Sequence, residues 1–368
     1  MGSKTVVLNP KTADESTMPI SEPRSTATLG IQSDTAFHEA TKRMSGQDLC
    51  SIADLSVAQM AAIMELAHAV KAQPEDFRHS LDAKQMVMFF EKASLRTRLT
   101  FEAAINTLGG NAIFVDQTSS PLGERESLPD MARNLERWMN IIVLRTYSHE
   151  TITEMAACAK VPVVNALSDL EHPCQALADF MTLEERFGSA EGLHFAYVGD
   201  GNNVCHSLML AAAQLGAHCH VATPRGFVPK LDIIHKAIEI SEQTGGSITL
   251  LNDPVKAVTR ADAVYTDVCT SMGFEHEAAR RAPIFKPYQV NEELMSFAQP
   301  HAVFMHCLPA HRGAEVTDAV LDGPQSVVFD QAENRLHAQK AILLTLLGGA
   351  KRLQINQNRG HQPRRRSA

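Results

Sequence analysis

The sequence lacks paired cysteines, and its few cysteines are spread along the chain. The seven cysteines stand singly, no two of them are spaced as in a Cys-x-x-Cys motif, and their number is odd. This pattern disfavours a disulfide framework and a structural zinc site, and it is typical of a reducing compartment. We therefore expect a cytoplasmic protein.

The sequence also lacks long apolar runs and an excess of positive charge. No run approaches the roughly 20 apolar residues that cross a bilayer. The 368 residues are 44% hydrophobic and 21% charged, which is typical of a soluble globular chain long enough for two domains. The net charge of −8 disfavours a nucleic-acid partner. Any anionic ligand must therefore be bound by local basic residues.

The two ends of the chain differ in composition from the rest. Residues 1–45 are rich in Ser, Thr and Pro without a sustained period, which predicts a disordered N-terminal extension. Acidic residues at positions 14, 15 and 22 argue against a transit peptide. Residues 353–368 carry Arg364, Arg365 and Arg366, and we interpret them as a disordered, solvated basic tail.

Between these ends, short apolar runs alternate with helical patterns. Strands are predicted at residues 85–90, 112–116, 140–146, 161–167, 193–200, 217–224, 247–253, 261–267 and 301–309. Alternation of strand and helix predicts an α/β fold with parallel sheets flanked by helices. We expect two such domains, residues 46–185 and 186–352, and a final helix at about 332–347 that packs back on the first domain. Ligands of such folds bind beyond the carboxyl ends of the strands.

The segment "FFEKASLRTRLTFEAA" (89–104) places basic and hydroxyl side chains at a strand-to-helix turn. The first N–H groups of a helix are unpaired, and the helix dipole presents partial positive charge there. With Arg96, Ser94 and Thr97 added, the turn predicts a phosphate-type anion site. A capped helix with solvated arginines is the alternative for this motif taken alone. The glycines and the Lys-Ser/Thr pair of a nucleotide P-loop are missing.

A second turn, "VGDGNNV" (198–204), has part of a dinucleotide-binding pattern. Gly199 and Gly201 supply the first two glycines, but Val204 occupies the position of the third. The acidic residue expected about 20 positions later is also absent. A dehydrogenase is therefore an alternative that the turn does not favour.

Four motifs together carry a resemblance to a known family. "SLRTR" (94–98) resembles the carbamoyl phosphate signature of the aspartate and ornithine carbamoyltransferases, and "HPCQALADFMTL" (172–183) resembles their His-Pro-x-Gln motif. "TDVCTSMG" (266–273) and "HCLPAHRG" (306–313) resemble segments of the ornithine branch. The likeness runs from about residue 47 to residue 350. It implies transfer of a carbamoyl group from carbamoyl phosphate to the δ-amine of L-ornithine, which gives L-citrulline and phosphate in arginine metabolism.

The resemblance also implies the residues of the site. Those for carbamoyl phosphate are Ser94, Leu95, Arg96, Thr97, Arg145, His172, Gln175, Cys307, Leu308 and Arg335. Those for ornithine are Asn203, Asp267, Ser271 and Met272. Arg145 and His172 would stabilise the carbonyl oxyanion, and Cys307 would accept a proton. Such a transfer needs no cofactor and no metal, and His306 with Cys307 is not expected to bind a metal, because two ligands at adjacent positions make a poor site. The family resemblance further implies a homotrimer with sites between subunits.

Three positions depart from the family pattern. Leu95 replaces a threonine, Pro121 replaces a glutamine that reaches a neighbouring subunit's phosphate, and Cys269 replaces a tryptophan. These changes affect the expected affinity for carbamoyl phosphate more than the type of reaction. Two alternatives stay open: a sister carbamoyltransferase with another amine acceptor, such as aspartate, putrescine or an acylated ornithine, and a catalytically degenerate homologue that acts as a binding partner. The metabolic direction, biosynthetic or catabolic, stays open as well.

Overall fold

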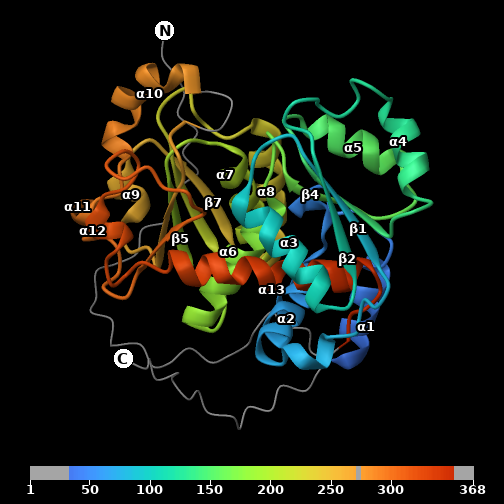
Figure 1. The fold of residues 1–368 in the computed structure, drawn as a ribbon. Helices are drawn as coiled ribbons and strands as arrows, with labels where there is room; N and C mark the ends of the chain where they lie inside the picture. The colour runs from blue at the N-terminus through green and yellow to red at the C-terminus, as the bar shows by residue number, and fades with distance from the viewer. Residues whose placement is uncertain (1–32, 271–274, 352–368) are drawn as a thin grey trace, which may run out of the picture.

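The computed structural model describes residues 33–270 and 275–351, and these form two α/β units (Figure 1). The strands of the first unit are β1 (Gln85–Phe90), β2 (Asn111–Asp116), β3 (Ile141–Arg145) and β4 (Val163–Leu167). Those of the second unit are β5 (His194–Val198), β6 (His218–Ala222), β7 (Ser247–Leu251), β8 (Ala263–Thr266) and β9 (Val303–His306). Every predicted strand is confirmed.

Both sheets are parallel, with strand orders β2-β1-β3-β4 and β7-β6-β5-β8-β9. The central strands β1, β3 and β5 are almost fully buried, because helices cover both faces of each sheet. The predicted α/β class with two sheets is therefore confirmed. The predicted site residues Ser271 and Met272 and the predicted tail 353–368 lie outside the described residues.

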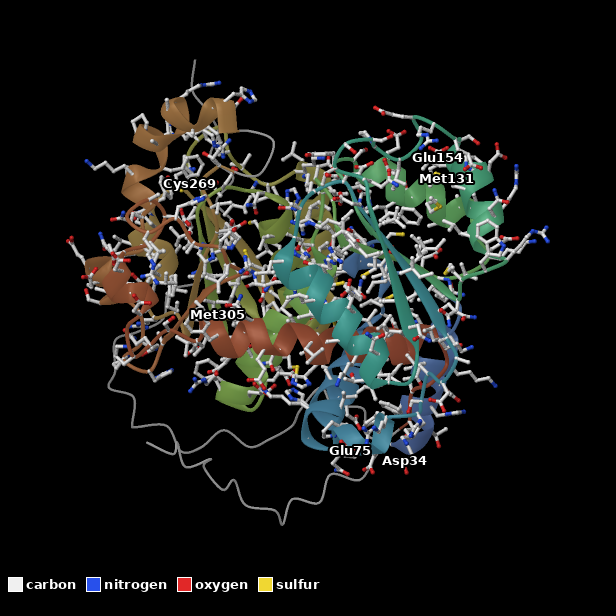
Figure 2. All side chains as sticks on the ribbon, in the orientation of Figure 1. Asp34, Glu75, Met131, Glu154, Cys269 and Met305 are labelled. Atoms are coloured by element: carbon white, nitrogen blue, oxygen red, sulfur yellow. The ribbon has the colours of Figure 1, made fainter. Side chains whose placement is uncertain are left out.

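The helices connect successive strands and cover the sheets, and side chains fill the layers between them (Figure 2). Their bounds are α1 (Asp34–Met44), α2 (Val57–Ala72), α3 (Leu95–Thr107), α4 (Leu128–Leu135), α5 (His149–Cys158), α6 (Pro173–Phe187), α7 (Asn203–Gln214), α8 (Leu231–Thr244), α9 (Pro254–Val258), α10 (Ala278–Phe285), α11 (Glu292–Met295), α12 (Asp318–Leu321) and α13 (Val328–Leu346). None of the described helices is long and apolar enough to cross a membrane.

Helix α1 corrects one prediction, because part of the segment expected to be disordered is helical. Ser33 caps the helix by accepting a hydrogen bond from the Ala36 N–H at 3.2 Å. Phe37, Ala40 and Met44 lie on one face and are buried. This apolar stripe packs against α2 and α13, and the burial stabilises a short helix that its composition did not indicate.

Helix α13 returns from the second unit and packs against α6, α2 and α3, as predicted (Figure 1). It carries Arg335 to Thr97 and Gln175 of the first unit, where the arginine side chain is buried. In each sheet, neighbouring strands end side by side: Phe90 pairs with Arg145, and Thr266 pairs with His306. The loops that follow these strand ends carry the candidate site.

Candidate active site

The turn before α3 has the geometry of an anion cradle. Ser94 caps the helix, and its Oγ accepts a hydrogen bond from the Thr97 N–H at 3.3 Å. Arg96 is half-buried beside it, whereas the Leu95 side chain is 70% exposed. Leu95 can therefore serve the cradle only through its backbone. The second arginine of the motif, Arg98, lies 3.8 Å from the Phe114 ring centroid and pairs with a glutamate one turn away.

Three arginines from distant parts of the chain converge next to this cradle. Burial lowers the pKa of Arg145 to about 9, and the positive charges of Arg335 and Arg96 act in the same direction. Burial also lowers the pKa of Arg335, with a further contribution from Arg96. Cations that repel one another in a buried site favour binding of an anion, because the anion relieves the repulsion.

Several buried nitrogens of this cluster have no hydrogen-bond partner among the residues that the structure describes. They are Arg145 Nε, His172 Nδ1 and Arg335 Nε. The pKa of His172 is well below its ordinary value because of burial, with Arg335 and Arg145 adding to the effect. The imidazole is therefore neutral at neutral pH. Unpaired buried donors are costly in a folded protein, and here they mark a place for a substrate oxygen.

A chain of hydrogen bonds links the cradle to helices α6 and α13. The Arg335 guanidinium donates to Thr97 Oγ1 at 2.9 Å and to the Gln175 side-chain oxygen. The Gln175 amide nitrogen in turn donates to Asp179 Oδ1 at 2.7 Å, and the Gln331 amide nitrogen donates to the same oxygen at 2.7 Å. The structure thus brings together the predicted Thr97, Gln175 and Arg335, and it adds Asp179 and Gln331, which the motifs did not assign.

His172 is held in place from both units. Its backbone N–H donates to Ser207 Oγ at 2.8 Å, and that hydroxyl donates to Glu171 Oε2 at 3.0 Å. The Glu171 carboxylate also accepts from the Ile52 N–H at 3.1 Å and from the Ser51 hydroxyl of the first unit. Burial raises the pKa of Glu171 to about 7. The sequence motifs did not assign Glu171 to the site. Its position directly before the His-Pro-x-Gln motif was the one feature of the sequence that could have indicated it.

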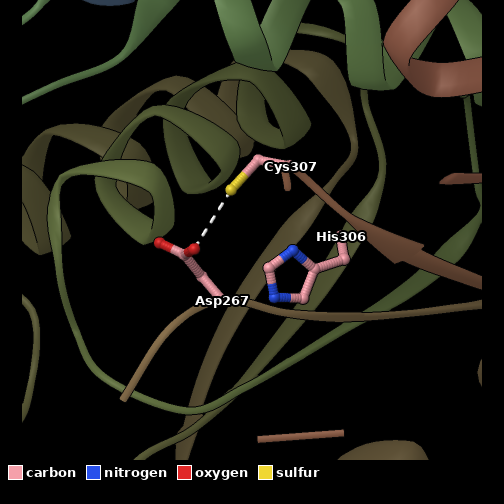
Figure 3. A group of neighbouring side chains, drawn as sticks. All are labelled: Asp267, His306 and Cys307. Atoms are coloured by element: carbon pink, nitrogen blue, oxygen red, sulfur yellow. Dashed lines mark hydrogen bonds between the residues drawn. The ribbon is translucent and has the colours of Figure 1, made fainter. Parts of the chain in front are cut away.

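The second unit contributes an acidic half of the site. Cys307 follows β9, and its Sγ donates to Asp267 Oδ1 at 3.0 Å (Figure 3). The Asn202 side-chain amide donates to Asp267 Oδ2 at 2.7 Å. Burial and the Asp267 charge hold the pKa of Cys307 well above its ordinary value, so the thiol is protonated. In this state the thiol is a donor, and its implied role as a proton acceptor stays a prediction.

Asn203 lies at the start of α7 with its amide turned toward the first unit. Its Nδ2 donates to the Ser168 carbonyl at 2.6 Å. The neighbouring Asn202 contacts Asp267 and also caps α7, since its side-chain oxygen accepts from the N–H groups of Val204 and Cys205. Asparagine ahead of a helix is a frequent cap, so Asn202 could have been found from the sequence.

The glycines of the "VGDGNNV" turn serve close packing. A Cβ at Gly201 would lie 2.3 Å from the Pro229 nitrogen and 2.6 Å from the Phe227 carbonyl oxygen. The Gly201 N–H donates to that carbonyl at 2.9 Å. This glycine is therefore required by the backbone of residues 227–229, which gives it a role unrelated to a dinucleotide phosphate.

Asp267, His306 and Cys307 present ligand-type atoms within 4.8 Å of one another, a spacing that a metal ion could use (Figure 3). Both nitrogens of His306 are engaged, however. Nδ1 accepts from the Leu308 N–H at 2.9 Å, and Nε2 lies 3.3 Å from Glu315 Oε1. The imidazole thus fixes the loop that carries Cys307 and Leu308, and it offers no free nitrogen to a metal.

Two family models match nearly the whole described chain. Residues 47–185 match the aspartate/ornithine carbamoyltransferase carbamoyl-P binding domain. Residues 191–346 match the Asp/Orn binding domain of the same family. The first range contains the arginine-rich cradle, and the second contains Asp267 and Cys307.

Individual relatives agree with these matches. The ornithine carbamoyltransferase of Pyrococcus horikoshii is 49% identical over 310 residues, which are 84% of this chain and 98% of that protein. The Shewanella oneidensis ornithine carbamoyltransferase is 51% identical over 296 residues, 80% of this chain and 98% of that protein. The solved structure of the Pyrococcus furiosus ornithine carbamoyltransferase matches with a TM-score of 0.81 and 48% identity, covering 84% of this chain and 99% of that one. The chain therefore belongs to the aspartate/ornithine carbamoyltransferase family.

Proposed function

We propose that this chain catalyses transfer of the carbamoyl group from carbamoyl phosphate to the δ-amine of L-ornithine, giving L-citrulline and phosphate. The observation that carries the proposal is the pairing of two unlike half-sites. Arg96, Arg145 and Arg335 form a buried cationic half, and Asp267 with Cys307 forms the acidic half. The two halves are adjacent, because Gln331 bridges them. Its amide nitrogen donates to Asp179, which also accepts from the Gln175 amide, and its oxygen accepts from the His306 N–H next to Cys307. Relatives about half identical in sequence are named ornithine carbamoyltransferase.

The cationic half suits a bound carbamoyl phosphate. The phosphate is held by the N–H groups at the start of α3, Ser94, Arg96 and Arg145. The unpaired donors of Arg145 and His172 bind the carbonyl oxygen, where negative charge develops during attack. The Gln175 side-chain oxygen and the Leu308 backbone accept from the carbamoyl NH₂ group. Neutral His172 donates a hydrogen bond without adding a further positive charge.

The acidic half suits an amino acid. The Asp267 carboxylate pairs with the α-ammonium group of ornithine, while Asn203, Ser271 and Met272 stay the predicted contacts to its backbone groups. The uncharged δ-amine attacks the carbonyl carbon, the bond from that carbon to the phosphate oxygen breaks, and its electron pair leaves with phosphate. The amine proton leaves with phosphate or solvent. Ornithine binding also offsets the Asp267 charge that keeps the Cys307 thiol protonated.

The assembly is a homotrimer with sites between subunits. Apolar side chains beside the cradle support it: Leu95 and Leu99 on α3 are 70% and 53% exposed, and Ile113 on the edge strand β2 is 46% exposed. A neighbouring subunit on this face would bury them next to the phosphate. Light scattering coupled to size exclusion tests this, and a monomer at micromolar concentration would contradict it. The enzyme acts in the cytoplasm in arginine biosynthesis, and one relative is named anabolic.

A panel of amine acceptors tests the activity. Purified protein with carbamoyl phosphate should carbamoylate ornithine, and aspartate, putrescine and N-acetylornithine should give little product. Preference for one of the other amines would instead identify a sister carbamoyltransferase. Absence of product, together with no carbamoyl phosphate binding at millimolar ligand, would identify a degenerate homologue.

A further inference from the structure

Asp179 is a buried carboxylate at the centre of the site whose partners are all uncharged side chains. It lies on α6 one turn after Gln175 and is fully buried. Oδ1 accepts from the Gln175 and Gln331 amide nitrogens, both at 2.7 Å, and the Tyr265 hydroxyl also stabilises the carboxylate. Arg335 reaches Gln175 rather than Asp179.

Such an arrangement is costly for stability. A carboxylate removed from water without a paired cation loses hydration that neutral hydrogen bonds replace only in part, and burial raises the pKa of Asp179 to about 7. An uncharged side chain of the same size would be easier to bury. A buried acid beside substrate-binding residues therefore points to a role in the reaction.

The role of Asp179 follows from the hydrogen bonds that Asp179 and Arg335 can form with the Gln175 amide between them. The ionised form of Asp179 only accepts hydrogen bonds, and the Gln175 amide nitrogen accordingly faces its Oδ1. A guanidinium only donates, so the Gln175 oxygen must face Arg335. The Gln175 oxygen is thereby presented to the cradle, where it can accept from a carbamoyl NH₂ group. A reversed amide would place an NH₂ group against both Arg335 and the carbamoyl nitrogen.

A second arm holds Asp179 itself. The Gln331 amide nitrogen donates to Asp179, and the Gln331 oxygen accepts from the His306 N–H at 3.0 Å. His306 precedes Cys307, so this arm ties the carboxylate to the loop after β9. One acid thus fixes an amide in each half of the site.

We propose that Asp179 is a positioning residue that sets the orientation of the Gln175 amide and connects it, through Gln331, to the Cys307 loop. The inference rests on the proposed carbamoyl transfer. Asp179 touches no reacting atom, and it acts through Gln175. Most of the effect of its loss on the use of carbamoyl phosphate should therefore depend on the presence of Gln175.

A double-mutant cycle tests this coupling. Asp179→Leu should lower kcat/KM for carbamoyl phosphate by about tenfold to a hundredfold, the range expected for a misplaced substrate contact. In a Gln175→Ala background the same change should lower it by less than about threefold, because the effect acts through a side chain already removed. Asp179→Asn should stay within about threefold of the unmodified enzyme, since its oxygen can still accept from both glutamines.

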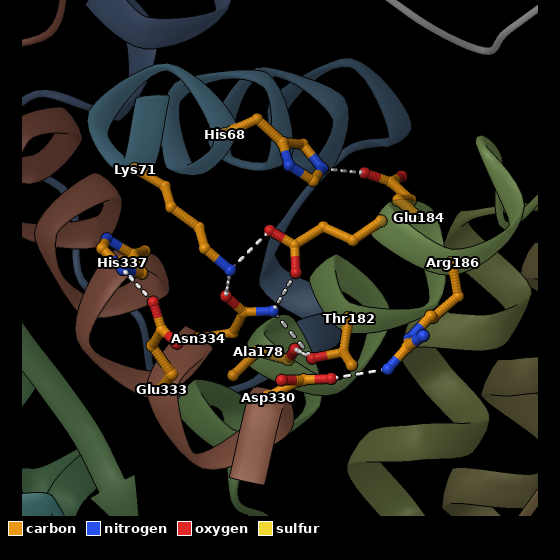
Figure 4. Close-up of polar contacts among 11 residues, drawn as sticks. His68, Lys71, Ala178, Thr182, Glu184, Arg186, Asp330, Glu333, Asn334 and His337 are labelled. Atoms are coloured by element: carbon orange, nitrogen blue, oxygen red, sulfur yellow. Dashed lines mark hydrogen bonds and ion pairs between the residues drawn. The ribbon is translucent and has the colours of Figure 1, made fainter. Parts of the chain in front are cut away.

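The matched control is Thr182→Val, one turn further along the same buried face of α6. Thr182 accepts from the Asn334 amide at 2.9 Å, and Asn334 also contacts Glu185 and Lys71 in a polar cluster (Figure 4). Thr182→Val should lower the melting temperature and leave kcat/KM within about twofold, because the Thr182 hydrogen bonds, to the Ala178 carbonyl and the Asn334 amide, involve residues outside the proposed substrate site.

Each possible result of these variants either supports or rejects the positioning role of Asp179. The positioning role would be overturned if Asp179→Leu lowered kcat/KM equally with and without Gln175→Ala. It would also be overturned if Asp179→Asn were as slow as Asp179→Leu. If Asp179→Leu does not fold, Asp179→Ser carries the same cycle, because a hydroxyl both donates and accepts and no longer dictates the amide orientation. If the unmodified protein forms no citrulline, the proposed function itself is rejected, whatever the variants show. Citrulline formation with an additive cycle rejects only this inference.

Discussion

At the scale of single residues, Asp267 shows how one carboxylate can serve two states of the site. In the free chain it accepts from the Cys307 thiol and from the Asn202 amide, so both of its oxygens are occupied. These neutral donors hold the carboxylate in position until a stronger partner arrives. An ammonium group forms charge-assisted bonds roughly twice as strong as neutral ones and can displace the thiol.

Replacing Asp267 should impair the use of ornithine without impairing the binding of carbamoyl phosphate. Asp267→Asn keeps the size of the side chain but removes the charge that pairs with the α-ammonium group. Since a hydrogen bond to a charged group contributes about 1.5–3 kcal/mol, kcat/KM for ornithine should fall at least about tenfold. Carbamoyl phosphate should still bind when followed by calorimetry, because its cradle lies on the other unit. Parallel loss of both ligands would instead make Asp267 a structural residue.

Glu171 should make stability depend on pH. Burial raises its pKa to about 7 in the folded chain. The folded state therefore keeps a proton that the unfolded chain releases at lower pH, so this contribution to stability is full below the ordinary glutamate pKa and is lost as pH rises through about 7.

Glu171→Gln tests whether stability falls as pH rises because of Glu171, since glutamine cannot ionise. The free energy of unfolding in urea should be measured for both proteins at several pH values from acidic to alkaline. The variant should gain stability relative to the unmodified chain as pH rises through about 7. A difference between the two proteins that stays constant with pH would contradict the assignment.

At the scale of elements, the start of α3 combines a helix terminus that favours an anion with an apolar side chain, Leu95, that cannot bind one. The backbone N–H groups and the Ser94 cap favour an anion, but the Leu95 side chain is exposed and cannot donate to it. Pro121, in the loop after β2, is exposed and has no amide side chain to offer. The cradle therefore depends on Arg96, Arg145 and the helix end.

Restoring the two polar side chains should strengthen carbamoyl phosphate binding. Leu95→Thr with Pro121→Gln should lower the KM for carbamoyl phosphate by about tenfold per restored bond, because each new donor would meet a charged phosphate. The preferred amine should not change, since neither residue belongs to the acidic half. Each single variant serves as the control for the other, and an unchanged KM in the double variant would show that neither position reaches the phosphate.

At the scale of the whole molecule, catalysis depends on two units that bring opposite kinds of charge together. The chain has a net charge of −8, yet its first unit and α13 concentrate three arginines at one point. The acidic half faces them from the second sheet. In the proposed reaction, a cationic amino acid and an anionic phosphate would be bound side by side, with the attacking amine directed at the carbonyl carbon.

This arrangement predicts how the rate of the whole enzyme depends on pH. The δ-amine of ornithine resembles lysine, with a pKa near ~10.4, so only about one molecule in a thousand is uncharged at neutral pH. Activity at low ornithine should rise from about pH 7 to roughly pH 8.5 as the uncharged fraction grows. Initial rates across this range at saturating carbamoyl phosphate test it. A flat profile would show that amine attack is not the pH-sensitive step.

The strands, the parallel sheets and the residues of the four motifs could be predicted without a structure, because apolar runs and short motifs are local signals. Tertiary structure alone decided which of these residues meet. Arg335 and Thr97 lie 238 positions apart and share a hydrogen bond only because α13 returns to the first unit. The contacts of Asn202 and Asp179 and the burial of α1 likewise come from packing between distant segments. No local pattern records such contacts, since each depends on where another part of the chain lies.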